Sequence, residues 1–118
     1  MTGVQTCALP IYDGLNRTDD ALEKLQKAAV IKPSAHVLSQ IGMVNGKAGR
    51  WNEALVALAA AERLDPNFAD TYVYRGIVYF KTGQLLNAVQ EYRHALEIDP
   101  GNEQASKDLA VVMGQLRK

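Results

Sequence analysis

The sequence predicts an all-α protein, a solenoid of stacked antiparallel helical hairpins. At an offset of 34 residues, the chain matches itself at positions that determine backbone geometry. A weaker copy precedes these two at an offset of 33 residues. Such a period is typical of helical hairpins, each of which buries its apolar face only against its neighbours. The matching pairs are Gly42 and Gly76, Gly49 and Gly83, Ala54 and Ala88, Ala61 and Ala95, Asp65 and Asp99, and Pro66 and Pro100; the weaker copy comprises Ala21, Leu25, Ala28 and Pro33.

Apolar residues that recur at spacings of three and four predict where the helices lie. The first predicted helix begins at Thr18, because Asp19 and Asp20 then place negative charge in its first turn, where the helix dipole favours it. We expect no strand. The predicted helices are 18–31, 35–48, 51–64, 69–82, 85–98 and 103–117.

Glycine and proline predict where the helices end. A glycine follows the first helix of each hairpin, where a residue of positive φ closes a helix at little steric cost. Proline lacks a backbone donor and disfavours the helical conformation of the residue before it, so the second helix ends there. Polar residues then start the next helix as N-caps. The glycines are Gly49 and Gly83, the prolines are Pro66 and Pro100, and the N-caps are Ser34, Asn67 and Asn102.

Small residues recur where the two helices of one hairpin are expected to cross. Gly42 and Ala54 form one such pair, and Gly76 and Ala88 form the next. A larger side chain at these places would hold the two backbones apart. The spacing therefore predicts close helix packing in both hairpins.

Two segments resemble the tetratricopeptide repeat (TPR) in their signature residues. The resemblance implies a right-handed α-solenoid of about two and a half repeats plus a capping helix: a partial repeat 12–34, repeats 35–68 and 69–102, and the cap 103–118. Two residues depart from the pattern, since Arg75 replaces a usual aliphatic residue and Asn45 a usual aromatic one. The signature residues are Leu38, Ile41, Gly42, Ala54, Leu58, Ala61 and Pro66 in the first segment, and Tyr72, Gly76, Tyr79, Ala88, Tyr92, Ala95 and Pro100 in the second.

Residues 1–11, MTGVQTCALPI, do not fit the repeat. They resemble the in-frame translation of a common sequencing-library adapter, so we interpret them as non-native, the alternative being a genuine divergent terminus. Tyr12 aligns with Tyr79, and recognisable repeat sequence begins there. We therefore expect that the first helix of the first hairpin has been replaced and that 12–118 is a fragment of a longer protein, from a bacterial source. The single cysteine, Cys7, lies in this segment and carries no argument about redox chemistry.

The last predicted helix has one apolar face, formed by Leu109, Val112 and Leu116, and charged residues elsewhere. A solenoid needs such a helix to cover its final apolar surface. We interpret it as a C-terminal cap.

The composition excludes several classes of partner. The chain has 13 basic and 13 acidic residues, so the net charge is zero and the electrostatic footprint of a protein that binds nucleic acid or an anionic membrane is absent. The apolar run 54–61 is much shorter than the roughly 20 residues of a membrane-spanning helix. We expect a soluble segment, cytoplasmic or periplasmic, with a protein or peptide partner.

No constellation of residues predicts catalysis, a cofactor or a metal site. His36 and His94 are isolated on helices of different hairpins, whereas these chemistries need several groups within reach of one another. The acidic residues Asp65, Asp70, Asp99 and Glu103 lie at the ends of predicted helices, where carboxylates are expected for capping and for the helix dipole. We therefore expect a non-enzyme without a cofactor.

The resemblance implies that the first helices of successive hairpins line a concave groove, with a contribution from the capping helix. Its apolar centre would be Met43, Val73, Ile77 and Phe80, with Tyr74 adding a hydroxyl. The predicted groove residues are His36, Ser39, Gln40, Met43, Lys47, Asp70, Val73, Tyr74, Ile77, Phe80, Lys81, Gln104, Lys107 and Val111.

Several of these positions have two interpretations. Tyr74 and Phe80 line the groove or pack between hairpins. Trp51 covers the edge of a hairpin or contacts a partner. Lys47 and Lys81 recur one repeat apart, which fits either a paired contact with an anion or solvated charge. The tyrosines at signature positions are expected in the core.

One subset of the resembled family binds the C-terminal carboxylate of chaperone tails through Lys, Asn and Arg. Asp70 and Tyr74 stand where that subset has Lys and Arg. We therefore expect that this clamp is absent and that the groove prefers apolar or basic segments.

The function predicted first is a non-catalytic scaffold that binds a peptide or helix of a partner in the groove. The alternative is a C-terminal appendage of a larger enzyme or of a membrane- or secretion-associated protein whose active part lies upstream. Self-association through the face of the truncated first hairpin is a third possibility.

Overall fold

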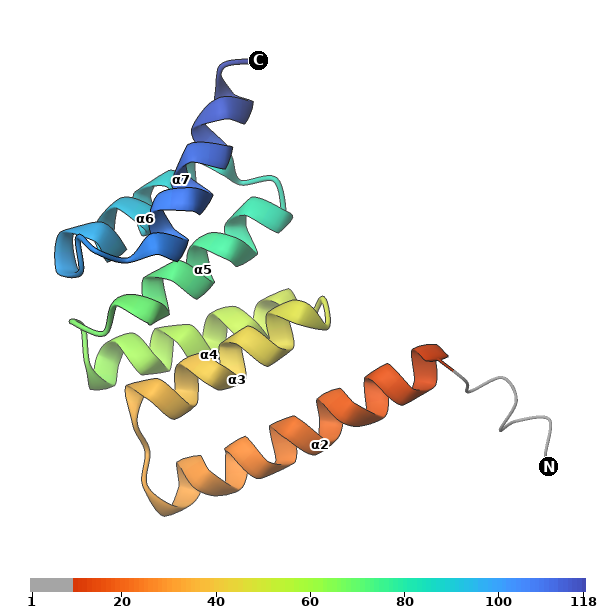
Figure 1. The fold of residues 1–118 in the computed structure, drawn as a ribbon. Helices are drawn as coiled ribbons and strands as arrows, with labels where there is room; N and C mark the ends of the chain where they lie inside the picture. Colours follow the sequence, from red (N-terminus) through yellow and green to blue (C-terminus); the bar gives the residue numbers. More distant parts are fainter. Residues whose placement is uncertain (1–9) are drawn as a thin grey trace.

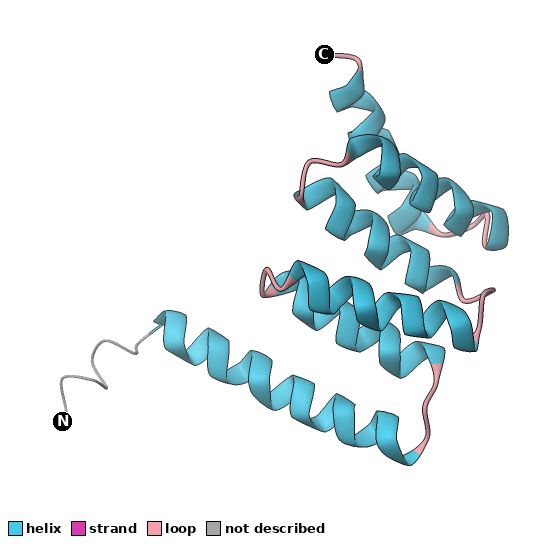
Figure 2. Ribbon diagram, turned by 180° about the vertical axis from the view of Figure 1, so that it is seen from behind, coloured by secondary structure: helices cyan, strands magenta, loops and turns pink. Residues whose placement is uncertain are grey.

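A computed structural model describes residues 10–118 of the chain. Over this range the structure is all-helical and has no strand, as predicted (Figure 2). Five of the helices begin and end within one residue of the predicted bounds, and α2 differs at its start. The helices are α2 (Pro10–Ile31), α3 (Ala35–Lys47), α4 (Trp51–Leu64), α5 (Ala69–Lys81), α6 (Leu85–Ile98) and α7 (Glu103–Leu116).

The helices stack as antiparallel hairpins in the order of the chain. Helix α3 pairs with α4 and α5 pairs with α6, while α7 packs on α6 and α2 packs on α3 (Figure 1). Contacts between the hairpins run from α3 to α5 and from α4 to α5. The first helices α3 and α5 are therefore neighbours, which is the arrangement that an α-solenoid requires.

Both hairpin turns depend on glycine. Gly49 has φ 79° and Gly83 has φ 81°, a backbone conformation that is costly for residues with a Cβ. The structure therefore confirms the prediction that these glycines close the first helix of each hairpin.

The N-caps are confirmed at two places and wrong at a third. Ser34 accepts a hydrogen bond from the backbone N–H of Val37 at 3.1 Å, and Asn102 accepts one from that of Ala105 at 2.9 Å. Asn67 is not the N-cap of α5. Its backbone N–H donates to Oδ1 of Asp65 at 3.0 Å in a tight turn, and Phe68 takes the cap position without a side-chain bond.

The prediction that the first helix begins at Thr18 is wrong, because α2 is continuous from Pro10 to Ile31. In each later hairpin, a glycine of positive φ stands in the turn just before the second helix, and the first helix of the hairpin runs antiparallel to the second. Asn16 stands at the equivalent sequence position, and in the described part of the chain no helix precedes α2. Residues 1–9 of the suspected adapter segment lie outside the described residues.

Both helix crossings are as close as the small residues predicted. A Cβ added to Gly42 would lie 2.6 Å from Cγ of Leu58, and one added to Gly76 would lie 2.6 Å from Cε1 of Tyr92. Leu58 and Ala54 are fully buried, and Tyr92 is 1% exposed. Each glycine thus makes room for a large core side chain on the second helix of its own hairpin.

Polar contacts tie the two hairpins together. The hydroxyls of Ser39 on α3 and Thr71 on α5 lie 2.8 Å apart, and both residues are fully buried. Arg75, the departure from the usual aliphatic residue, pairs with Glu62 of α4 at 2.7 Å and Glu91 of α6 at 3.0 Å. The guanidinium therefore bridges the second helices of both hairpins.

Asn45, the other departure, is buried and donates from Nδ2 to the backbone oxygen of Ile41 at 3.1 Å. A hollow of about 630 Å³ lies beside it, between α2, α3 and α4. The equivalent residue of the next hairpin is Tyr79, which packs against the core. The smaller amide thus leaves open a space that an aromatic ring fills one repeat later.

The capping helix buries Ala105 and Val112, which are 0% and 1% exposed, but its predicted apolar face is only partly covered. Leu116 remains 41% exposed, so its assignment to the buried face is wrong. The reason is visible in Figure 1, where the end of α7 projects beyond the hairpin on which the helix packs.

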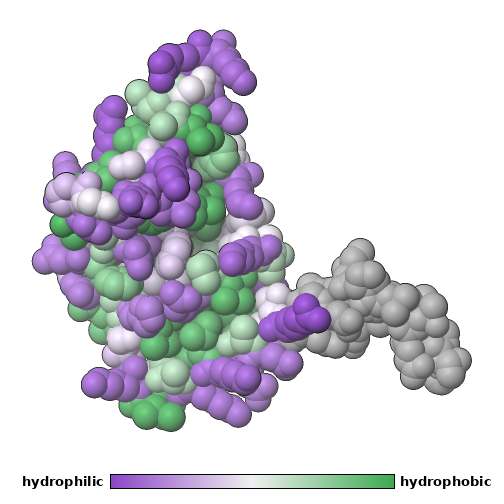
Figure 3. Space-filling view, in the orientation of Figure 1, coloured by the Kyte–Doolittle hydropathy of each residue, from purple (hydrophilic) through white to green (hydrophobic). Residues whose placement is uncertain are grey.

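Apolar surface is distributed in patches between polar residues (Figure 3). One patch lies where α2 ends, where Val30 and Ile31 are 84% and 83% exposed. Among the described residues, none of the helices combines the length and hydropathy needed to cross a bilayer.

Candidate functional site

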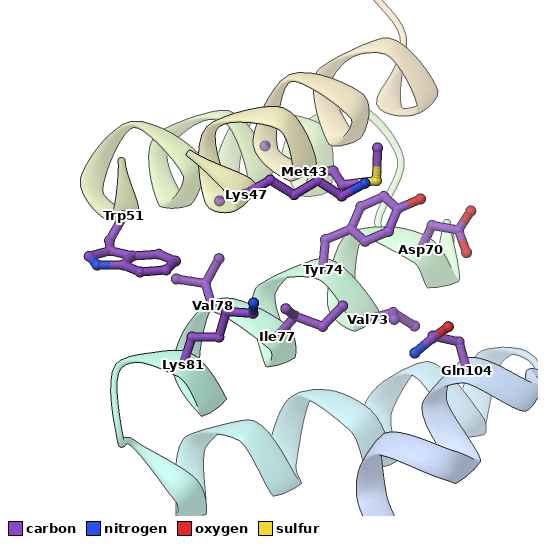
Figure 4. A pocket seen from close by; sticks show the side chains of 12 residues that line it. Met43, Lys47, Trp51, Asp70, Val73, Tyr74, Ile77, Val78, Lys81 and Gln104 are labelled. Carbon is purple, nitrogen blue, oxygen red and sulfur yellow. The ribbon is translucent and has the colours of Figure 1, made fainter. Parts of the chain in front are cut away.

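A groove of about 470 Å³ runs between α3 and α5, with contributions from α4 and α7 (Figure 4). It lies where the repeat geometry brings successive first helices side by side, so residues one repeat apart face each other across it. Its lining residues are Gly42, Met43, Gly46, Lys47, Trp51, Asp70, Val73, Tyr74, Ile77, Val78, Lys81 and Gln104.

The floor of the groove is apolar and rigidly held. Val73 and Val78 are 2% and 3% exposed, and both belong to the hydrophobic core of the hairpins. Ile77 and Tyr74 are half-buried on the same helix, and Met43 faces them from α3 (Figure 4). An apolar side chain of a ligand that settles here would lose water contact on several sides, which favours binding.

The charged residues of the groove are unequally distributed. Lys47 and Lys81 occupy equivalent positions on α3 and α5, and both are exposed. Asp70 lies near the start of α5, at the end of the groove away from Trp51 (Figure 4). Within the described residues, none of these three forms an ion pair, so their charges are available to a ligand.

Tyr74 provides a hydroxyl at the centre of the groove. Gln40 donates to this hydroxyl from Nε2 in a long hydrogen bond of 3.5 Å. Burial and, next, the negative charge of Asp70 raise the pKa of Tyr74 above its ordinary value near 10.0. The phenol therefore stays protonated at neutral pH and can donate to a carbonyl of a bound segment.

A second, smaller hollow of about 240 Å³ continues the groove toward α7. Ile77, Lys81 and Gln104 line both hollows, so the two form one trough along α5. Phe80 and Val111 face only the second part.

The structure brings ten of the fourteen predicted groove residues into this trough. Tyr74 and Phe80, which had two interpretations, both line it while also contacting the core. The residues in the main groove are Met43, Lys47, Asp70, Val73, Tyr74, Ile77, Lys81 and Gln104, and those in the second part alone are Phe80 and Val111.

Four predicted groove residues line neither hollow. Ser39 is wrong as a groove residue, because it is fully buried against Thr71 between the hairpins. His36 lies edge-on against the ring of Phe68, with 5.9 Å between the ring centroids. Gln40 reaches the trough only through its bond to Tyr74, and Lys107 is exposed on α7.

The sequence interpretation missed four residues that line the main groove, and also Tyr92 and Asp108 in the second hollow. Gly42 and Gly46 have no side chains, so their backbone forms part of the groove wall on α3. Val78 belongs to the hydrophobic core and also lines the groove. Trp51 lies at the start of α4, where its ring covers the end of the groove (Figure 4). The sequence did contain a sign of this position: Trp51 is the single tryptophan of the chain and stands two residues after the turn glycine Gly49.

Outside the trough, His94 stacks on Tyr72 with 3.9 Å between ring centroids. Arg75 lies over the same tyrosine ring at 5.5 Å. The Tyr72 hydroxyl donates to the backbone oxygen of Pro66 at 2.6 Å. This cluster joins α5 to α6 and to the preceding turn. In the described part of the chain, no group of His, Cys, Asp or Glu side chains is arranged to hold a metal ion.

Two family models match the chain: one described as TPR repeat matches residues 47–83, and one described as tetratricopeptide repeat matches residues 69–102. The chain is 31% identical over 97 residues to the small glutamine-rich tetratricopeptide repeat-containing protein 2 of Mycosarcoma maydis, a match that covers 81% of this chain and 28% of that protein. It is 32% identical over 103 residues to the probable UDP-N-acetylglucosamine–peptide N-acetylglucosaminyltransferase SPINDLY of Arabidopsis thaliana, with 86% and 11% covered. The chain thus spans less than a third of either relative.

A solved structure, the first TPR of Spaghetti (RPAP3) bound to the HSP90 peptide SRMEEVD, superposes with a TM-score of 0.78. The superposition covers 91% of this chain and 86% of that one at 20% sequence identity. At this identity the similarity concerns the fold.

Proposed function

Since the chain is built of tetratricopeptide repeats, we propose that it is a non-catalytic scaffold that binds a segment of a partner protein in the trough along α5. The observation that carries the proposal is the combination of an apolar floor, formed by Val73 and Ile77, with charges that have no partner inside the described residues. Binding sites for peptides are typically concave and mostly apolar, with a few polar groups that fix orientation.

The aromatic residues support the same proposal. Tyr74 and Trp51 present large, rigid surfaces to the groove, and such residues are over-represented among those that dominate interface energies. The buried hydroxyl pair of Ser39 and Thr71 fixes α3 relative to α5, so the two walls are held in place before binding. A preformed groove loses less conformational entropy when it binds.

We propose further that the groove does not hold a C-terminal carboxylate near Asp70. The related structure carries an acidic peptide, SRMEEVD. In this chain the carboxylate of Asp70 would repel a terminal carboxylate placed beside it. A peptide with a free carboxyl terminus should therefore bind no more tightly than its amide, whereas a clear preference for the free acid would contradict this proposal.

The proposed function is tested by peptide-array selection followed by binding assays on the full chain. Ile77→Asp places a charge on the groove floor, so we expect it to abolish binding of the selected peptides while helical circular dichroism persists. Leu86→Asp is the matched control, because Leu86 is 69% exposed on α6 and lines neither hollow. Equal binding by both variants would place recognition elsewhere on the molecule.

A second role is favoured by the name of one relative: this segment is an appendage of a larger enzyme. The similar Arabidopsis protein is named a probable glycosyltransferase, of which the match covers 11%. Under this proposal the trough recruits the substrate protein of an active domain encoded upstream. The upstream reading frame of the intact gene tests it: an enzyme domain in frame would support the role, and its absence would oppose it.

Self-association through α2 is proposed from a difference in burial between equivalent residues. On α2, one row of small and aliphatic side chains is only half-buried, while its equivalents on α4 are fully buried against the first helix of their hairpin. A second copy that covers this row would complete the packing. Sedimentation at increasing concentration tests the proposal, and a constant monomeric size would refute it. The half-buried row is Ala21, Leu25 and Ala28, and its equivalents are Ala54, Leu58 and Ala61.

A further inference from the structure

Resting on the proposed function, we infer which kind of segment the trough accepts. It is an extended peptide with an apolar centre, an acidic side chain that lies between Lys47 and Lys81, and a basic side chain that pairs with Asp70. The acidic and basic residues are about five positions apart in the partner.

The two lysines form the cationic part of the trough. They are 34 residues apart and therefore occupy the same position on neighbouring first helices. Figure 4 shows them on opposite walls: Lys47 extends from α3 toward Met43 and Tyr74, and Lys81 ends beside Ile77 on α5, so the space between the two ammonium groups lies over the apolar floor. Within the described residues, neither ammonium group forms an ion pair. A neutral segment that covered them would displace their hydrating water without supplying a counter-charge, which is unfavourable. An acidic side chain between them is therefore favoured over a neutral one.

Asp70 forms the anionic part. It lines the same groove at the opposite end of α5, and no described cation pairs with it. Gln104, its neighbour in the lining, donates from Nε2 to Asp108 at 2.9 Å and so has its amide engaged elsewhere. A basic side chain of the partner would compensate Asp70 when the groove is covered.

The spacing of these charges along α5 determines the spacing in the partner. Lys81 follows Asp70 by 11 residues, which corresponds to roughly 16 Å along a helix axis. An extended chain covers that length with about five residues at about 3.3 Å each. The apolar residues between the two charges then lie over Val73, Tyr74 and Ile77.

The test uses blocked synthetic peptides and the emission of Trp51, the single tryptophan of the chain, which lines the groove. The probe is acetyl-Gly-Glu-Ser-Leu-Phe-Leu-Lys-Gly-amide, made also with Glu and Lys exchanged because either chain direction fits the charges. For the tighter binder of the two, replacing its Glu by Gln should weaken binding at low salt by about fivefold or more, and high salt should reduce the difference. Equal binding of the Glu and Gln peptides would overturn the inference while the proposed function stands.

Charge reversal in the protein provides the second arm. The double variant Lys47→Glu, Lys81→Glu should lose the preference for the Glu peptide over the Gln peptide. The control Lys24→Glu, Lys32→Glu changes the net charge by the same amount on exposed residues outside the trough and should keep that preference. A preference that survives in the first variant would overturn the inference, and binding of no probe by the wild type would count against both the inference and the proposed function.

Discussion

Gly76 lies in direct contact with the ring of Tyr92 across the α5–α6 hairpin, so close that an added Cβ would be 2.6 Å from Cε1 and 2.9 Å from Cδ1. The ring is 1% exposed and packs in the core cluster of this hairpin, so it must shift against its neighbours before a Cβ fits. The same relationship joins Gly42 to Leu58 in the preceding hairpin. The missing side chain on one helix is thus what allows a large one on the other.

Replacing Gly76 by Ala should therefore destabilise the protein, although alanine is the better helix former. Overpacking of a tight core costs about 1–3 kcal/mol, against a gain of about 1 kcal/mol in helix propensity. We expect a net loss of up to about 2 kcal/mol, measured by urea unfolding. Gly114→Ala is the control: no atom lies within 4 Å of its added Cβ on α7, so it should stabilise. A Gly76→Ala variant that is also stabilised would show that the crossing is looser than described.

The buried hydroxyl pair of Ser39 and Thr71 predicts non-additive mutations. Ser39→Ala leaves the fully buried Thr71 hydroxyl without its partner, which should cost about 1–3 kcal/mol. Adding Thr71→Val removes the orphaned hydroxyl at nearly constant shape, so the double variant should be more stable than the sum of the single effects predicts. Strict additivity in this double-mutant cycle would mean that the two hydroxyls do not interact.

The Arg75 ion pairs predict a larger effect than an exposed pair gives. Arg75→Gln removes partners of Glu62 and Glu91, whose side chains are 40% and 19% exposed. We expect a loss of about 1–3 kcal/mol in the free energy of unfolding, because Glu91 is left mostly buried without its cation. Arg50→Gln is the control, because the side chains of Arg50 and its partner Asp19 are 33% and 62% exposed. This more solvated ion pair should contribute less than about 1 kcal/mol. Equal effects would argue that the Arg75 bridge is as well solvated as a surface pair.

Tyr92 predicts a loss of stability at alkaline pH. Burial and, next, the negative charge of Asp108 raise the pKa of this phenol above its ordinary value near 10.0. The folded state thus favours the protonated form, so the stabilisation is complete below pH 10 and is lost as the pH rises above it. Tyr92→Phe should reduce the fall in the free energy of unfolding between pH 9 and about pH 11, measured with guanidinium. An unchanged fall would assign the alkaline transition to other groups.

The periodic residues predicted most of the fold because each has a local physical reason. Gly49 and Gly83 supply positive φ, and Ser34 and Asn102 supply cap oxygens, so the neighbouring sequence is sufficient. The start of α2 at Pro10 was not predicted, because Asp19 and Asp20 have the charge pattern of a helix start although the helical backbone runs through them from Pro10. Asn67 was wrong as an N-cap because the turn held by the side chain of Asp65 ends at Phe68, which takes the cap position of α5.

The groove was predictable where the repeat alone determines the facing direction, as for Met43 and Ile77. Ser39 lies on the same helix as Met43, but its burial depends on Thr71, which a single helix pattern does not reveal. The role of Arg75 required the positions of two acidic residues on different helices. The repeat pattern of the sequence thus does not reveal the contacts between residues of different hairpins.

The central claim is that the trough along α5 binds a peptide, and the most direct measurement is amide chemical-shift mapping of the ¹⁵N-labelled chain with the tighter of the two charged probe peptides. We predict saturable shifts that centre on Met43, Tyr74 and Ile77 and extend to Gln104 on α7, with the outward faces of α4 and α6 unchanged. Saturable shifts confined to α4 and α6, or no shifts at millimolar peptide, would contradict the claim.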